Sequence, residues 1–142
     1  MRLPVLIFLL LCLTSAHSAD PIGSVKTYQP EAVIIHAGQE IEAAVGTPIH
    51  TGDQVITHTQ GSVGIIFIDG AVLTLGPETR FTIDEFIFNP AEKEVSFIGN
   101  IIKGTISFLS GAIGRISPES VKIKTPTATL GLRGTKILVE VK

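Results

Sequence analysis

Short stretches in which hydrophobic and polar residues alternate recur along most of the chain. In one such stretch Phe81 and Ile83 share a face, and in another Ile137, Val139 and Val141 do. A period of two residues is typical of a β-strand with one buried and one exposed face. We therefore expect strands at about 23–28, 31–36, 40–44, 53–58, 62–68, 71–75, 79–83, 85–88, 94–98, 104–109, 120–124, 127–130 and 135–141.

One hydrophobic stretch departs from this alternation. Residues 63–68 are apolar at almost every position, so we expect a central strand that is covered on both faces. Asp69 and Gly70 follow directly and precede a second apolar stretch at 71–75. Asp-Gly between two apolar segments predicts a hairpin, because both residues tolerate positive φ. Residues 111–120 are rich in Gly, Pro and Ser, and we expect a loop there.

The composition supports an all-β fold. Over residues 19–142 the chain has 19 Ile, 10 Val and 13 Thr, against 6 Leu and 9 Ala. β-branched side chains suit a pleated sheet better than a helix. All 14 glycines lie in this part of the chain and separate short apolar segments, as turn residues do in all-β proteins. The length fits a single domain, and its many short strands indicate a sandwich, a barrel or a β-solenoid-like wrap.

The first residues follow a different pattern. Arg2 precedes an apolar run over residues 3–13, and small and polar residues come next. This order is typical of a secretory signal peptide. The apolar run is too short to span a bilayer, which takes about 20 residues. We therefore expect residues 1–18 to be a cleaved signal peptide, and residues 19–142 to be a periplasmic or secreted domain without a transmembrane anchor.

Two details of the leader leave alternatives open. Cleavage after Ala16 or Ala19 fits nearly as well as cleavage after Ser18. Cys12 is the single cysteine, and a lipoprotein would carry its lipid on a cysteine near this position. A small residue is expected before such a cysteine, whereas Leu11 stands there. We interpret Cys12 as part of the removed apolar run.

Charge and metal-binding chemistry argue against two classes of function. Removal of the leader removes one arginine and no acid, so the formal net charge of −2 becomes −3, which does not favour nucleic-acid binding. His36, His50 and His58 remain, but their spacings of 14 and 8 residues match no compact metal motif. We expect no metal site and no cofactor, and we interpret the three histidines as surface or strand-edge residues.

No catalytic residue is expected either. Asp84 and Glu85 are adjacent and would point to opposite faces of a strand, whereas paired carboxylates for acid–base catalysis must converge on one bond. The chain has no Gly-x-Ser-x-Gly elbow and no glycine motif for phosphate or dinucleotide binding. An enzyme such as an envelope hydrolase is therefore the least favoured function.

Two segments form an ordered pair of motifs. Residues 52–77 contain Gly-Asp before a strand and then an apolar strand that ends in Asp-Gly, and residues 125–135 begin with Thr-Pro and close with Arg-Gly-Thr. Together the motifs resemble the FecR domain family, named for the periplasmic regulator of ferric-citrate uptake. The resemblance covers roughly residues 25–141, which is nearly the whole chain after the signal peptide. The residues that carry the resemblance are Gly52, Asp53, Asp69, Gly70, Thr125, Pro126, Arg133, Gly134 and Thr135.

The resemblance implies an exported, all-β and non-enzymatic domain. In the best-known regulators of this family, the domain relays receptor occupancy through a transmembrane helix to a sigma factor. We do not expect that relay here, because the chain has a leader in place of a cytosolic segment. We expect structural roles for the motif residues. Asp53 and Asp69 suit turns. Arg133 would bind one of these carboxylates or backbone carbonyls, and contact with a ligand is the less favoured alternative.

The leading hypothesis from the sequence is a non-catalytic binding or signalling module of the bacterial cell envelope. Its partner would be a protein or an envelope polymer. An alternative is a scaffold subunit that assembles by strand addition, because an uncovered final strand at 135–141 would be open to pairing with another chain. The sequence predicts no oligomeric state.

Overall fold

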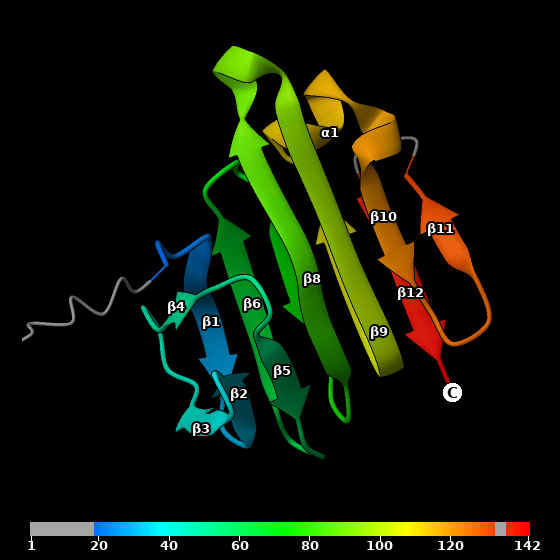
Figure 1. Ribbon diagram of the computed structural model, residues 1–142. Coiled ribbons are helices and arrows are strands. Elements are labelled where there is room, and N and C mark those ends of the chain that lie inside the picture. The colour runs from blue at the N-terminus through cyan, green and yellow to red at the C-terminus, as the bar shows by residue number, and fades with distance from the viewer. Residues whose placement is uncertain (1–18, 133–135) are drawn as a thin grey trace, which may run out of the picture.

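The strands form one curled sheet with the shape of a half-barrel (Figure 1). The computed structural model describes residues 19–132 and 136–142. The all-β prediction is confirmed. The strands are β1 (Gly23–Gln29), β2 (Ala32–His36), β3 (Gln39–Glu42), β4 (Pro48–Ile49), β5 (Gln54–Thr57), β6 (Ser62–Phe67), β7 (Val72–Leu75), β8 (Arg80–Asn89), β9 (Glu94–Leu109), β10 (Val121–Lys124), β11 (Thr129–Gly131) and β12 (Lys136–Val141). The helices are α1 (Ala112–Ile116) and the 3₁₀ turns η1 (Pro90–Glu92) and η2 (Pro118–Ser120).

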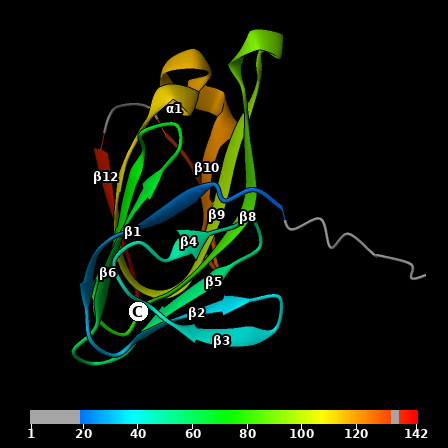
Figure 2. The same cartoon turned by 90° about the vertical axis from the view of Figure 1, so that its left-hand side faces the viewer.

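Strand β9 belongs to both halves of the curled sheet. Its residues 104–109 lie in a half with the strand order β4-β1-β6-β7-β9-β12. Its residues 94–103 lie in a half with the order β3-β2-β5-β8-β9-β10-β11. Strands β9 and β10 pair in parallel. A side view shows β12 and β10 on opposite sides of the curl, with α1 at one end of it (Figure 2).

The chain passes from one half to the other at Gly104. The φ angle of Gly104 is +98°, which favours glycine. Thr79 is fully buried beside this corner, and its Oγ1 accepts a hydrogen bond from the Thr105 N–H at 3.0 Å. A Cβ atom on Gly104 would collide with Thr79. Gly104 is therefore required both for the bend and for close packing.

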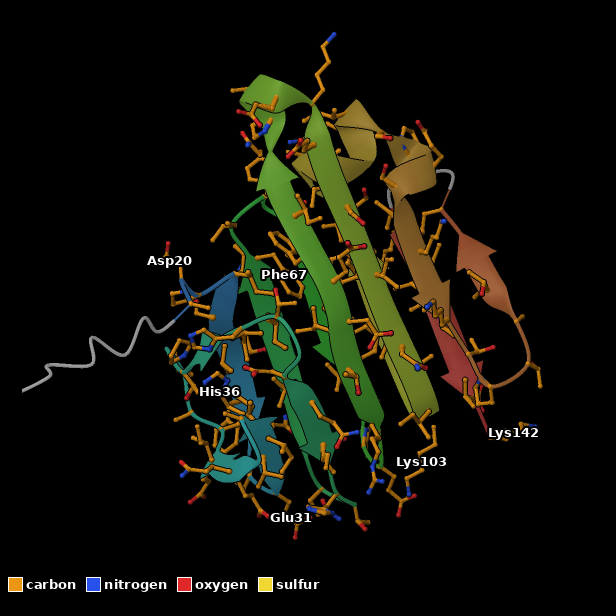
Figure 3. The ribbon with its side chains drawn as sticks, in the orientation of Figure 1. Asp20, Glu31, His36, Phe67, Lys103 and Lys142 are labelled. Atoms are coloured by element: carbon orange, nitrogen blue, oxygen red, sulfur yellow. The ribbon has the colours of Figure 1, made fainter. Side chains whose placement is uncertain are left out.

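A cluster of four phenylalanines fills the space between the halves. Phe67 packs against Phe86 with ring centroids 5.5 Å apart, and it meets Phe97 edge-on at 5.3 Å. Phe97 also lies 4.9 Å from Phe108. Phe67 and Phe108 come from one half of the sheet, whereas Phe86 and Phe97 come from the other. Figure 3 labels Phe67, which is only 3% exposed. These contacts join the two halves into one hydrophobic core.

Two strands are longer than the sequence predicts. The expected segments 94–98 and 104–109 are both parts of the continuous strand β9. Gly99 was expected to interrupt a strand, but it lies inside β9. The position requires glycine because a Cβ atom there would collide with the ring of Phe81. The segments 79–83 and 85–88 likewise lie almost entirely in β8, with a β-bulge between Ile83 and Glu85.

Two further local predictions are wrong. The stretch 63–68 is central in its sheet, between β1 and β7, but it is not covered on both faces. Ile66 and Ile68 point outward and are 36% and 60% exposed. The expected loop at 111–120 contains α1 and η2, because the side chain of Ile113 is buried in the core and fixes a helical turn. Among the described residues, no helix is both apolar and long enough to span a membrane.

Candidate functional site

The first family motif forms a tight turn that ends in a buried carboxylate. Gly52 has a φ of +90°, which a glycine adopts without strain. The Asp53 N–H donates to the His50 carbonyl at 3.2 Å, and the His50 N–H donates back to Oδ2 of Asp53 at 2.9 Å. The Asp53 side chain is only 2% exposed. The turn therefore fixes one oxygen of Asp53.

The sheet register brings His36 to the same carboxylate. Ile34 pairs with Val55 across β2 and β5, and both side chains are buried. Continuing this register by two residues sets His36 opposite Asp53, on the same face of the sheet. Nδ1 of His36 lies 2.6 Å from Oδ1 of Asp53. His36 is at the end of β2 (Figure 3).

The third member of the cluster is His50. Its Nδ1 lies 3.7 Å from Oδ2 of Asp53, and its ring centroid lies 4.4 Å from that of His36. This nitrogen is buried and has no hydrogen-bond partner, and it is the one such side-chain atom among the described residues. A buried polar group without a partner costs about 1–3 kcal/mol. We name His36, His50 and Asp53 the His–Asp cluster.

The prediction of surface or strand-edge histidines is wrong for His50, whose side chain is only 15% exposed. It also did not anticipate that His36 binds the same carboxylate. His36 and His50 are half-buried and share one carboxylate, whereas His58 is exposed and lies outside the cluster. The spacing along the sequence could not show this, because the cluster depends on the pairing of β2 with β5. Alternation along each strand could have indicated that both side chains face the same way as buried residues. His36 follows buried Ile34 by two residues, and Asp53 precedes buried Val55 by two.

Asp69 of the first motif lies in the hairpin between β6 and β7. The loop has three residues, 68–70, and Gly70 closes it with a φ of +86°. Oδ1 of Asp69 accepts from the Ala71 N–H at 3.0 Å, and Oδ2 accepts from the Ile113 N–H at 3.2 Å. The Asp69 carbonyl accepts from the Ala112 N–H at 2.9 Å. Asp69 thus attaches the hairpin to the start of α1.

The second motif begins with a turn between β10 and β11. The Thr125 N–H donates to the Ala128 carbonyl at 2.8 Å, and Oγ1 of Thr125 accepts from the Ala128 N–H at 3.1 Å. Pro126 is exposed at the tip of this turn. Arg133, Gly134 and Thr135 lie outside the described residues, so the contact of Arg133 with an aspartate stays a prediction.

A groove of about 870 Å³ lies between strands β10–β11 and strand β12, beside α1 and η2. A backbone hydrogen bond, together with a hydrogen bond from Ser117, lowers the pKa of Glu119. Glu119 is therefore an anion at neutral pH, and Lys122 supplies the opposite charge in the same groove. The residues that line the groove are Ser110, Gly114, Pro118, Glu119, Lys122, Thr129, Gly131, Leu132 and Ile137.

The family model described as "FecR protein" matches residues 53–142. The chain belongs to the FecR family. This is a family of domains related to cell-envelope signalling, and its domains are of the periplasmic type. No curated protein and no solved structure gives a significant match to the chain.

The match divides the functional candidates into two groups. Every described residue that lines the groove lies within the part matched by the FecR family, as does the Asp69 hairpin. His36 and His50 precede the matched part, which begins at Asp53. The groove is therefore built from the FecR segment, whereas the His–Asp cluster depends on residues that precede it.

Proposed function

We propose that this FecR-family protein is an exported, non-catalytic binding module of the cell envelope, and that it holds a segment of a partner protein in the groove. The signal-peptide pattern of residues 1–18 supports export. The family membership supports a role at the cell envelope. The groove itself is the observation that carries the proposal.

The lining of the groove suits a peptide better than a small charged ligand. Ile137 provides partly exposed apolar surface, and Glu119 and Lys122 provide one charge of each sign. Ligand sites commonly combine an apolar lining with a few polar groups that fix orientation. The volume of about 870 Å³ accommodates several side chains.

Strand β12 provides a second means of holding an extended segment. It pairs with β9, and no other described strand pairs with it. An edge strand offers unpaired N–H and C=O groups to an added strand. Addition of a peptide strand at a sheet edge is a common mode of recognition, in which main-chain hydrogen bonds give affinity and pockets give specificity.

A matched pair of charge reversals tests this proposal. Lys122→Glu places a second negative charge beside Glu119 in the groove, whereas Lys124→Glu makes the same change on the same strand outside the groove lining. Envelope proteins captured by the purified protein would be quantified by mass spectrometry. We expect Lys122→Glu to lose at least one specific partner that Lys124→Glu retains. Equal capture by the two variants would contradict a role for the groove.

The scaffold alternative rests on the same strand edge. Leu138 in β12 is 74% exposed, so a second copy of the chain could pack against it. Sedimentation velocity at increasing protein concentration separates the two functions. Concentration-dependent assembly that Leu138→Lys abolishes would favour a scaffold. A protein that stays monomeric at every concentration would favour the binding module.

The contacts of the adjacent acids favour structural roles over catalysis. Asp84 is exposed at the bulge of β8. Glu85 accepts a hydrogen bond from Oγ of Ser96 at 2.9 Å, across the pair β8–β9. This contact links neighbouring strands and supports the non-catalytic proposal.

A further inference from the structure

The His–Asp cluster combines two imidazoles and a carboxylate whose potential ligand atoms all lie within 4.8 Å of one another. We infer that His36, His50 and Asp53 bind one divalent transition-metal ion of the late first row, with Zn²⁺ as the representative. Imidazole nitrogens and a carboxylate oxygen are the ligands that such ions prefer. The inference is independent of the proposed function, because none of the described residues that line the groove belongs to the cluster.

The unpartnered nitrogen of His50 is the second observation that indicates an ion. Nδ1 of His50 is buried, accepts no hydrogen bond and donates none, yet it lies 3.7 Å from Oδ2 of Asp53. A metal ion between the two atoms would use the nitrogen lone pair and the carboxylate charge together. The backbone N–H of His50 already holds Oδ2 of Asp53 in place at 2.9 Å. Two of the three ligands are thus fixed by one turn.

The distances require only small movements on binding. Zn²⁺ binds nitrogen and oxygen at about 2.0–2.1 Å, which places tetrahedral ligand atoms about 3.3 Å apart. Nδ1 of His50 and Oδ2 of Asp53 must close slightly from 3.7 Å. With Oδ2 of Asp53 as the carboxylate ligand, Nδ1 of His36 must move from its hydrogen bond with Oδ1, at 2.6 Å, to the ion. The ion takes the place of the proton at Nδ1 of His36, and the neutral ring then carries its proton on Nε2.

The exposure of the three side chains fits an exchangeable site. The side chain of His36 is 39% exposed, that of His50 is 15% exposed and that of Asp53 is 2% exposed. The carboxylate therefore lies innermost, and the ion can reach it from the side of His36. Three protein ligands leave a coordination position for water or for a donor from another molecule. A closed structural zinc site would have four protein ligands.

The ion would join two segments that are distant in sequence. His36 ends β2, in the half of the sheet whose edge is β3, and His50 begins the turn before β5. Occupancy would therefore fix the β2–β3 hairpin to the turn at residues 50–53. This hairpin precedes the matched FecR segment, so the metal would act on a part of the chain outside it.

Titration with Zn²⁺ tests the inference directly. The purified protein, prepared without a histidine tag and freed of metal and chelator, would be titrated by calorimetry in competition with a chelator of known affinity. We expect one ion per chain. His36→Gln removes a half-exposed ligand and should weaken Zn²⁺ binding at least about 10-fold. Even substitution of a residue that only hydrogen-bonds to a metal ligand lowers metal affinity about 10–100-fold. His58→Gln is the matched control and should leave the affinity unchanged.

Imidazole ¹⁵N NMR of the unaltered protein gives a readout that does not depend on a variant that folds. We expect one equivalent of Zn²⁺ to shift the Nδ1 resonances of His36 and His50 and to leave those of His58 in place. Absence of saturable binding, equal affinity of the His36→Gln and His58→Gln proteins, or a shift confined to His58 would each overturn the inference.

Discussion

Asp69 allows the clearest test of how the first FecR motif stabilises the fold. Its side chain is buried, and its two oxygens accept hydrogen bonds from the N–H groups of Ala71 and Ile113. Asp69→Ala leaves both donors without a partner at a site that excludes water. Each buried donor that loses its partner costs about 1–3 kcal/mol. We expect the free energy of unfolding to fall by about 3–4 kcal/mol.

Equilibrium unfolding in urea, followed by circular dichroism, measures this loss. For a domain of this size, about 1 kcal/mol lowers the melting temperature by about 3–5 °C. Asp69→Ala should therefore melt about 10–15 °C below the unaltered protein. Asp69→Asn retains one carbonyl acceptor and should lose only about 1–3 kcal/mol.

Asp84→Ala is the matched control for this prediction. Asp84 is an exposed aspartate in the same protein, and its removal should change the free energy of unfolding by less than about 0.5 kcal/mol. The reasoning would be refuted if Asp69→Ala were as stable as Asp84→Ala. It would also be refuted if the alanine and asparagine variants at position 69 lost equal stability, because the loss would then not depend on the number of orphaned donors.

Three further substitutions test the core, the corner and the outer edge, each by the same urea titration. Phe97→Ala removes a buried ring that meets three others and should cost about 3–5 kcal/mol, and a loss below about 1 kcal/mol would contradict the core described above. Gly104→Ala forces a Cβ atom against Thr79 at a φ of +98° and should cost at least about 2 kcal/mol, whereas full stability would show that the corner adjusts freely. Leu138→Glu should change stability by less than about 0.5 kcal/mol, and a larger loss would mean that the exposed face of β12 is covered.

Alternation in the sequence predicted most of the strands because one face of each strand is buried. Phe81 and Ile83 are both fully buried, and Val139 is 7% exposed. The hairpin at Asp69–Gly70 also followed from local chemistry, since a residue of positive φ is needed where the loop closes. Features determined by a strand's own residues were therefore accessible without a structure.

Predictions failed where the environment of a residue depends on contacts with residues that are distant in the sequence. Gly99 resembled a turn residue, but it is glycine because the ring of Phe81 lies against it. Ile66 and Ile68 resembled buried residues, but Ile66 on β6 and Ile68 in the loop after it are exposed. The His–Asp cluster was missed for a related reason. It requires knowing that β2 pairs with β5, and the separation of the residues along the sequence carries no such information.

The central claim is that the groove between β10–β11 and β12 holds a segment of a partner protein. Site-specific photo-crosslinking in living cells tests it most directly, with the photoreactive residue placed at Thr129 in the groove or at Ile87, which is exposed on β8 and outside the groove. We predict a discrete protein adduct from position 129 and none of the same mass from position 87. No adduct at position 129, or the same adduct from both positions, would contradict the claim.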